Sequence, residues 1–347
     1  MRKWIVGYIL LTCRMFAFGQ TNDKPLHIRD YITQYLVNSA TVDTAVKNAN
    51  VALETLQDAK AGQASAYDLG LLENEYRFKQ SEILASENAA VKLAFQQVFA
   101  VFGNATSVEQ AKTAEEIARV EYERAEELLE KEYISVRDKR IVHKAFVQAQ
   151  SSTRDALSTY AVAQKVLSRA IGGGSVKVEP FETGVAIPDI EGIEWIVEHD
   201  AQVQKLKVDL SLYVERRKFL ITSDATYPAL LDALSEAIEE AEQALRDRIW
   251  YLDDSLAELF AQIESNNDEK VIAELDEEIK TMDLQEARHQ FERGNIYASD
   301  VTQAELAHAS VTAQLSSIKR NRFLLILDAL SLLNVSLMSW VEEHWSE

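Results

Sequence analysis

A seven-residue repeat near the C-terminus constrains the fold of this chain more than any other feature. Ala304, Val311, Ile318, Leu325 and Leu332 lie seven residues apart. A heptad spacing of apolar residues keeps one face of an α-helix against a partner helix and produces a left-handed supercoil. The sequence therefore predicts a long helix that packs lengthwise against another.

The same pattern occurs 162 residues earlier, which predicts an internal duplication. In the earlier pattern, mostly small residues occupy the heptad positions and the positions between them, which should let two helices approach closely. We expect this seam to contain the heptad series Val142, Ala149, Ala156, Ala163 and Ala170, and between its members Ala145, Ser152, Thr159 and Val166.

A helical turn precedes the later heptad series. Gly294 and Asn295 tolerate the left-handed backbone that ends a helix, and Ile296 follows them. Ser299 or Asp300 can cap the next helix by accepting a hydrogen bond from a free backbone amide. This stretch is predicted to be the tip of a helical hairpin.

The earlier heptad series has a corresponding tip. Glu132, Tyr133 and Ile134 occupy the positions that are equivalent to residues 294–296, and Asp138 is equivalent to the capping aspartate. The glycine is absent here, so the backbone of this tip is predicted to be less open to a partner than that of the later tip.

Composition supports long helices and excludes one class of ligand. The chain of 347 residues has only 11 glycines and 4 prolines, and no proline lies within residues 26–179 or 229–347. Lys and Arg number 36 against 56 Asp and Glu, a net charge of −20. Such an acidic chain is not expected to bind nucleic acid, whose phosphates require basic patches.

Residues 1–19 are predicted to be a secretory signal peptide. Arg2 and Lys3 precede an apolar segment, and Ala17-Phe18-Gly19 has the small residues of a cleavage site. Cys13, the single cysteine, would be removed with this segment, so the mature chain would contain no disulfide. We therefore expect secretion across the inner membrane.

The remaining chain divides into four segments. We predict a first helical repeat (20–174), a linker (175–192), a second helical repeat (193–334) and a short tail (335–347). The first repeat should begin with a helix over 28–60 and a second helix from Tyr67. Breaks or kinks are expected at Gly103-Asn104 and at 265–268, where glycine, serine and asparagine are poor helix formers.

The duplicated halves, the secretory signal and the tip pattern Gly-x-Ile-x-x-x-Asp at 294–300 resemble the TolC-like outer-membrane efflux proteins, over about residues 28–334. This resemblance implies that three chains form a helical tunnel through the periplasm, associated with the outer membrane. It also implies that the tips bind the adaptor protein of a tripartite efflux pump or type I secretion system, which includes an inner-membrane transporter. The partner-binding residues would then be Glu132, Tyr133, Ile134, Asp138, Gly294, Asn295, Ile296 and Asp300.

The sequence departs from that family at two places. Members carry a pair of β-strands between the first two helices of each half, and each spanning strand needs about nine to eleven residues. The corresponding gaps here, 61–66 and 223–227, are too short. We therefore predict an all-α chain of duplicated long helical hairpins without a transmembrane β-barrel.

Two other functions are compatible with the sequence. Glu-x-x-His pairs flank the second tip, Glu286 with His289 and Glu305 with His308, and this spacing is found in di-metal carboxylate helical bundles. The chain could also be a structural or adaptor-like coiled coil of the periplasm that conducts nothing. No phosphate-binding loop or nucleophile motif is present, so we expect a conduit without catalytic residues, cofactor or metal.

Overall fold

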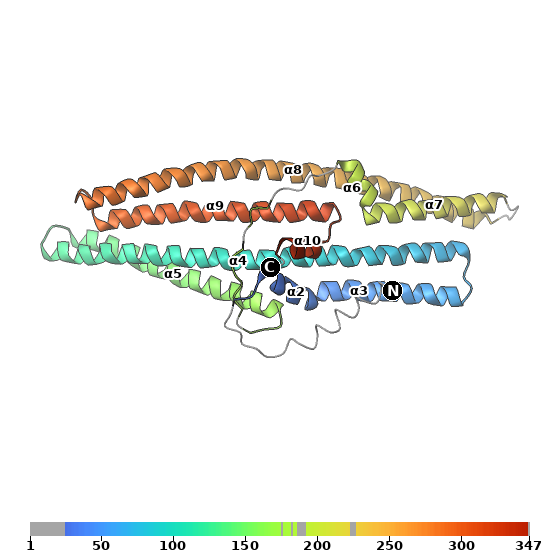
Figure 1. The fold of residues 1–347 in the computed structure, drawn as a ribbon, viewed down its shortest axis with the longest axis horizontal. Coiled ribbons are helices and arrows are strands. Elements are labelled where there is room, and N and C mark those ends of the chain that lie inside the picture. The colour runs from blue at the N-terminus through green and yellow to red at the C-terminus, as the bar shows by residue number, and fades with distance from the viewer. Residues whose placement is uncertain (1–24, 175, 182, 186–191, 223–226, 346–347) are drawn as a thin grey trace.

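The structure is a computed structural model that describes residues 25–174, 176–181, 183–185, 192–222 and 227–345. The predicted signal peptide and its cysteine lie outside these residues. Among them the chain forms nine helices, α2 to α10, arranged as an elongated bundle (Figure 1). The prediction of an all-α chain is confirmed.

Two hairpins of equal dimensions make up most of the bundle. Helices α4 (Ala66–Glu130) and α8 (Pro228–Glu292) each have 65 residues, and α5 (Val136–Ala170) and α9 (Ala298–Leu332) each have 35. Each helix of the second hairpin begins 162 residues after its counterpart, at 228 against 66 and at 298 against 136. At 1.5 Å per residue, the longer helices extend for about 100 Å.

The four long helices lie side by side in the order α5, α4, α9 and α8 (Figure 1). Helix α5 packs against α4, α4 against α9, and α9 against α8. Both hairpin tips lie at the same end of the bundle. Helices α5 and α8 are therefore the two edges of the layer.

Shorter helices complete both halves. Helices α3 and α7 pack on α4 and α8 and extend the bundle away from the tips (Figure 1), whereas α10 contacts α2, α4 and α9. Their bounds are α2 (Ile28–Val37), α3 (Ala40–Ala61), α6 (Ile193–His199), α7 (Ala201–Thr222) and α10 (Leu337–His344).

Two predicted helix boundaries are wrong, and of the two alternatives at Gly103 the structure has the continuous helix. The first helix is interrupted because the hydroxyl of Ser39 accepts a hydrogen bond from Val42 N and starts α3. Helix α4 continues through Gly103, and α8 continues through residues 265–268. Packing explains the last case, since buried Asn266 donates to the backbone oxygen of Ile318 on α9.

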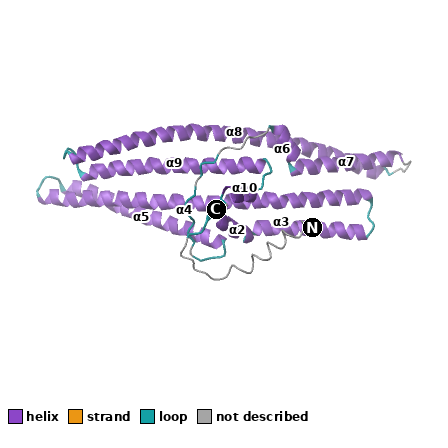
Figure 2. Cartoon of the chain, viewed as in Figure 1, coloured by secondary structure: helices purple, strands orange, loops and turns teal. Residues whose placement is uncertain are grey.

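Among the described residues there is no β-strand (Figure 2). One isolated β-bridge joins Leu26, before α2, to Val178 of the linker. The first short gap is a turn between α3 and α4, as predicted. Most of the second gap, residues 223–226, lies outside the described residues. No described helix is both long and apolar enough to cross a membrane.

The predicted seam is half correct. The heptad series from Val142 to Ala170 is partly buried along its length, as is the later series, whose Ile318 is fully packed. The intervening small residues Ala145, Ser152, Thr159 and Val166 are exposed instead. The positions one residue further on face the partner helix, and they are Phe146, Thr153, Tyr160 and Leu167.

The largest hydrophobic core lies midway along the bundle, where the linker and the C-terminal tail meet the long helices. Phe95 on α4 contacts Phe323 on α9, Phe181 of the linker and Trp345 of the tail. Asn88 holds the tail in place, because it donates to Val335 O and accepts from Leu337 N. Leu337, Trp340 and Val341 of the tail are thus part of the core.

Candidate functional site

The second tip begins where Gly294 ends α8. Its φ is +75°, and its amide donates to Phe291 O at 2.8 Å. The next amide, of Asn295, donates to Gln290 O at 2.9 Å. This pair of bonds satisfies the last carbonyl groups of the helix and requires a left-handed residue at position 294. The predicted helix end is confirmed.

The first tip has the same backbone without the glycine. Glu132 adopts φ +59°, and its amide donates to Leu129 O at 3.0 Å, while the Tyr133 amide donates to Leu128 O at 2.8 Å. The substitution of glutamate for glycine therefore leaves the turn intact. It adds a side chain to the place where the second tip exposes bare backbone.

Both tips close with an aspartate in the first turn of the returning helix. Asp138 accepts hydrogen bonds from the amide and the hydroxyl of Ser135, at 3.1 and 2.7 Å. These bonds lower the pKa of the Asp138 carboxyl. Asp300 accepts from the amide of Tyr297 at 2.8 Å. Helix α9 therefore begins at Ala298, before both predicted caps, and Asp300 stabilises the helix start from the first turn by this bond, whereas Ser299 does not.

Each tip presents one aromatic ring to solvent. Tyr133 is 75% exposed and Tyr297 is 63% exposed, whereas Ile134 and Ile296 are half-buried and anchor their turns. The sequence reasoning included Tyr133 and missed Tyr297. A tyrosine next to a predicted turn, outside the heptad register, could have identified it.

The second tip contacts helix α4 of the first hairpin. The guanidinium group of Arg124 on α4 lies 4.4 Å from the centre of the Tyr297 ring, a cation–π arrangement. Gln303 on α9 donates to Glu121 on α4 at 3.4 Å. The second tip thus lies against the end of α4 that leads into the first tip.

Solved structures with this arrangement include outer-membrane proteins and channels. The outer membrane protein VceC from Vibrio cholerae is 9% identical, with a TM-score of 0.65, over 89% of this chain and 96% of that protein. The CmeC outer membrane channel from Campylobacter jejuni is 12% identical, with a TM-score of 0.59, over 88% of this chain and 85% of the channel. The chain has the TolC-like fold.

Other comparisons found nothing: no protein-family model matches the chain, and no curated protein sequence does.

The open MtrE outer membrane channel from Neisseria gonorrhoeae shares the TolC-like fold at 13% identity and a TM-score of 0.54, over 89% of each chain. The structural likeness therefore extends along most of the chain and includes both hairpins.

The residues of the di-metal hypothesis are not brought together. Glu305 pairs with Arg288 at 2.8 Å, and the Nε2 atom of His308 lies 3.2 Å from the hydroxyl of Thr281. Glu286 accepts from Gln290 on its own helix. Within the described ranges, no group of three or more His, Cys, Asp or Glu side chains could hold a metal ion.

Glycine at position 132 should stabilise the first tip. A non-glycine residue with positive φ costs about 1 kcal/mol, so Glu132→Gly should slow hydrogen exchange of the amides at 131–133 several-fold. Glu127→Gly, inside α4, is the control and should accelerate the same exchange, because glycine in a helix costs about 1 kcal/mol relative to alanine. Faster exchange in Glu132→Gly would contradict the positive φ.

Proposed function

We propose that this protein is a passive conduit for export, the TolC-like helical tunnel component of a tripartite efflux pump or type I secretion system. The observation that supports this proposal is the shared fold with outer-membrane channels along 89% of the chain. In this proposal the chain is secreted, works in the periplasm in association with the outer membrane, and assembles as a homotrimer.

The edges of the helical layer support assembly into a ring. Large apolar side chains are exposed along each edge helix, which is unusual for a monomer in water. Contact of one edge with the opposite edge of the next copy is a head-to-tail interface, and such interfaces close into rings. The exposed residues are Ile141, Val147, Leu157, Val162 and Val166 on α5, and Phe260, Val271, Ile272, Leu275, Ile279 and Met282 on α8.

The hairpin tips are the proposed contact with a periplasmic adaptor and, through it, an inner-membrane transporter. Their backbone is held by the helix-ending and capping hydrogen bonds, so the exposed groups are presented in a fixed geometry. The proposed contact residues are Glu132, Tyr133, Ile134 and Asp138 of the first tip, and Gly294, Asn295, Ile296 and Asp300 of the second.

A Gly294→Glu variant tests this function. Glutamate occupies the same turn in the first tip, so the fold should survive at a cost of about 1 kcal/mol. The added side chain should block a partner that approaches the backbone. In host cells lacking the wild-type chain, we expect this variant to restore little export of a fluorescent efflux substrate, compared with the wild type.

Gly103→Ala is the matched control. A methyl group at Gly103, within α4, would meet only the flexible end of Arg320 at 3.8 Å, so export should be unaffected.

The purified mature chain should form particles with a hollow axis and the mass of three copies. A monomeric chain, together with undiminished export from cells that lack the chain altogether, would reject the conduit and favour a non-conducting coiled coil.

A further inference from the structure

The outer edge of α5 is cationic, although the chain as a whole is acidic. Helix α5 has seven Lys or Arg residues against two Asp, in a chain with a net charge of −20. The seventh, Lys139, pairs with Glu126. The other six occupy the three heptad positions opposite to the packed face of α5, with a single aspartate. They are exposed and have no ion-pair partner among the described residues, and they are Arg137, Arg140, Lys144, Arg154, Lys165 and Arg169.

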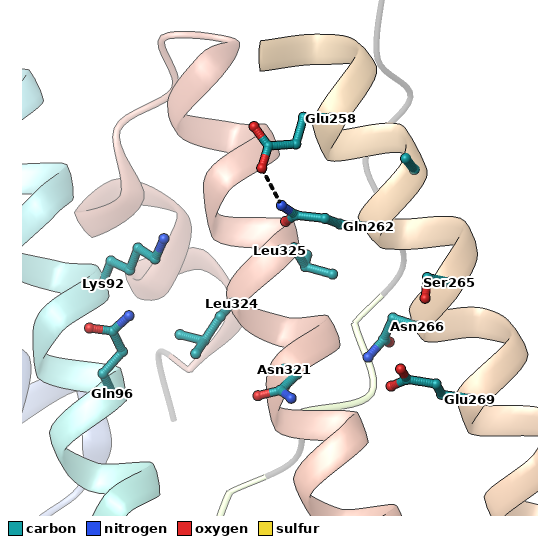
Figure 3. A pocket seen from close by; sticks show the side chains of 11 residues that line it. Lys92, Gln96, Glu258, Gln262, Ser265, Asn266, Glu269, Asn321, Leu324 and Leu325 are labelled. Atoms are coloured by element: carbon teal, nitrogen blue, oxygen red, sulfur yellow. Dashed lines mark hydrogen bonds between the residues drawn. The ribbon is translucent and has the colours of Figure 1, made fainter. Parts of the chain in front are cut away.

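The outer edge of α8 has the opposite charge. Over residues 258–292, the three heptad positions opposite to the packed face contain six carboxylates and no Lys or Arg. None of the six pairs with a Lys or Arg in the described part of the chain. Figure 3 shows one of them, which accepts a hydrogen bond at 2.9 Å from the neutral Gln262 of the same helix. The six exposed carboxylates are Glu258, Glu264, Asp268, Glu278, Glu286 and Glu292.

On both edges, two charged residues enclose an apolar stretch of similar length. Arg154 and Lys165 lie eleven residues apart on α5, and Asp268 and Glu278 lie ten residues apart on α8. At 1.5 Å per residue, these separations are about 16 and 15 Å. The two charge pairs can therefore meet at the same time. The exposed apolar residues between them are Leu157 and Val162 on α5, and Val271, Ile272 and Leu275 on α8.

The two edges fit together in one orientation. Both tips lie at the same end of the bundle, so α5 leads away from that end and α8 leads toward it (Figure 1). In neighbouring copies these helices are antiparallel, which brings Arg154 opposite Glu278 and Lys165 opposite Asp268. Contact between two α5 edges, or between two α8 edges, would bring like charges together. The charges thus select the head-to-tail contact over a symmetric pair.

We propose that each copy of this chain docks its cationic α5 edge on the acidic α8 edge of the next copy. Arg154 pairs with Glu278 of the next copy, and Lys165 with Asp268 of the next copy. The apolar stretch contributes most of the affinity, and the charge pairs determine the register and the choice of edge. This inference rests on the proposed homotrimer and names the interactions that order it.

Charge reversal on each edge, separately and together, tests the contact. Arg154→Glu with Lys165→Glu reverses the α5 pair, and Asp268→Lys with Glu278→Lys reverses the α8 pair. In sedimentation analysis, each double variant should raise the dissociation constant of the assembly at least about tenfold. The quadruple variant restores opposite charges at both pairs, so it should recover most of the wild-type affinity.

Lys207→Glu with Lys218→Glu is the control. It makes the same change in net charge at exposed positions of α7, which packs between α4 and α8 and is not an edge. This variant should assemble like the wild type. Equal dissociation of the control, or a quadruple variant that does not recover, would overturn the proposed pairs.

The same measurements separate this contact from the export function. A wild-type trimer that resists both charge reversals would reject the contact and leave the conduit in place. A wild-type trimer that responds to them but exports nothing would reject the conduit and leave the contact in place. A wild type that is monomeric at every concentration would overturn both.

Discussion

Replacement of Leu275 and Ile279 by glutamate should dissociate the proposed trimer into monomers. Both side chains lie on α8, at one edge of the helical layer, and are 55% and 49% exposed. In a ring they would be buried against the next copy, and two unpaired charges at that contact would each cost several kcal/mol. In the monomer both glutamates would remain in water, so the melting temperature of the monomer should change little.

Sedimentation analysis of the double variant beside the wild type measures this effect. Leu284→Glu provides the contrast, because Leu284 on the same helix is buried within the chain. That variant should lose helical structure at a lower temperature even as a monomer. A double variant that keeps the mass of the wild-type assembly would show that this stretch of α8 lies outside the contact between copies.

The hairpins and their tips were largely predictable, because their determinants are local. The heptad spacing identifies α5 and α9, and the glycine and the capping aspartate determine the turn of the second tip within seven residues. Glu132 is equivalent to Gly294 in the internal repeat, so a tip was predicted there as well. A glutamate by itself would not have indicated a positive φ. The role of the tip residues in partner binding stays a prediction.

The seam register could not be decided from spacing. A heptad series at Ala149 and Ala156 is compatible with second positions either three or four residues later. The small residues three positions later suggested close packing, but Thr153 and Tyr160, four positions later, face the partner helix. Larger side chains bury more apolar surface there. Only the direction of the neighbouring helix distinguishes the two possibilities.

The predicted break at 265–268 was wrong, and the helix also continues through Gly103, for a related reason. Gly103 and residues 265–268 have weak helix propensity, but each costs only about 1 kcal/mol or less per residue. Contacts along a helix of 65 residues outweigh that cost. Similarly, the docking of the tail depends on Asn88, which is 249 residues from its partner Leu337. Contacts of that separation have no signature in one sequence.

Phe95→Ala should cause the largest loss of stability among single substitutions in this chain. Its side chain is fully buried, and its ring lies 4.8 Å from that of Phe323 and 5.7 Å from that of Phe181. Removing a buried phenylalanine ring typically costs about 3–5 kcal/mol, because apolar contacts are lost and a cavity remains. Chemical denaturation followed by circular dichroism should show this difference, while Phe219→Ala, at an exposed position of α7, should cost less than about 1 kcal/mol.

The position of Phe95 also predicts which segments respond first. Its ring contacts Phe181 of the linker and Trp345 of the tail. Both segments should therefore lose their protection from hydrogen exchange before the long helices do. The tips lie at the ends of α4 and α8, far from Phe95, and are closed by their own hydrogen bonds, so their exchange should change little in the variant. If exchange increased equally at the tips and in the tail, the bundle would unfold as one unit. The hydrophobic core around Phe95 would then not hold the linker and tail independently of the long helices.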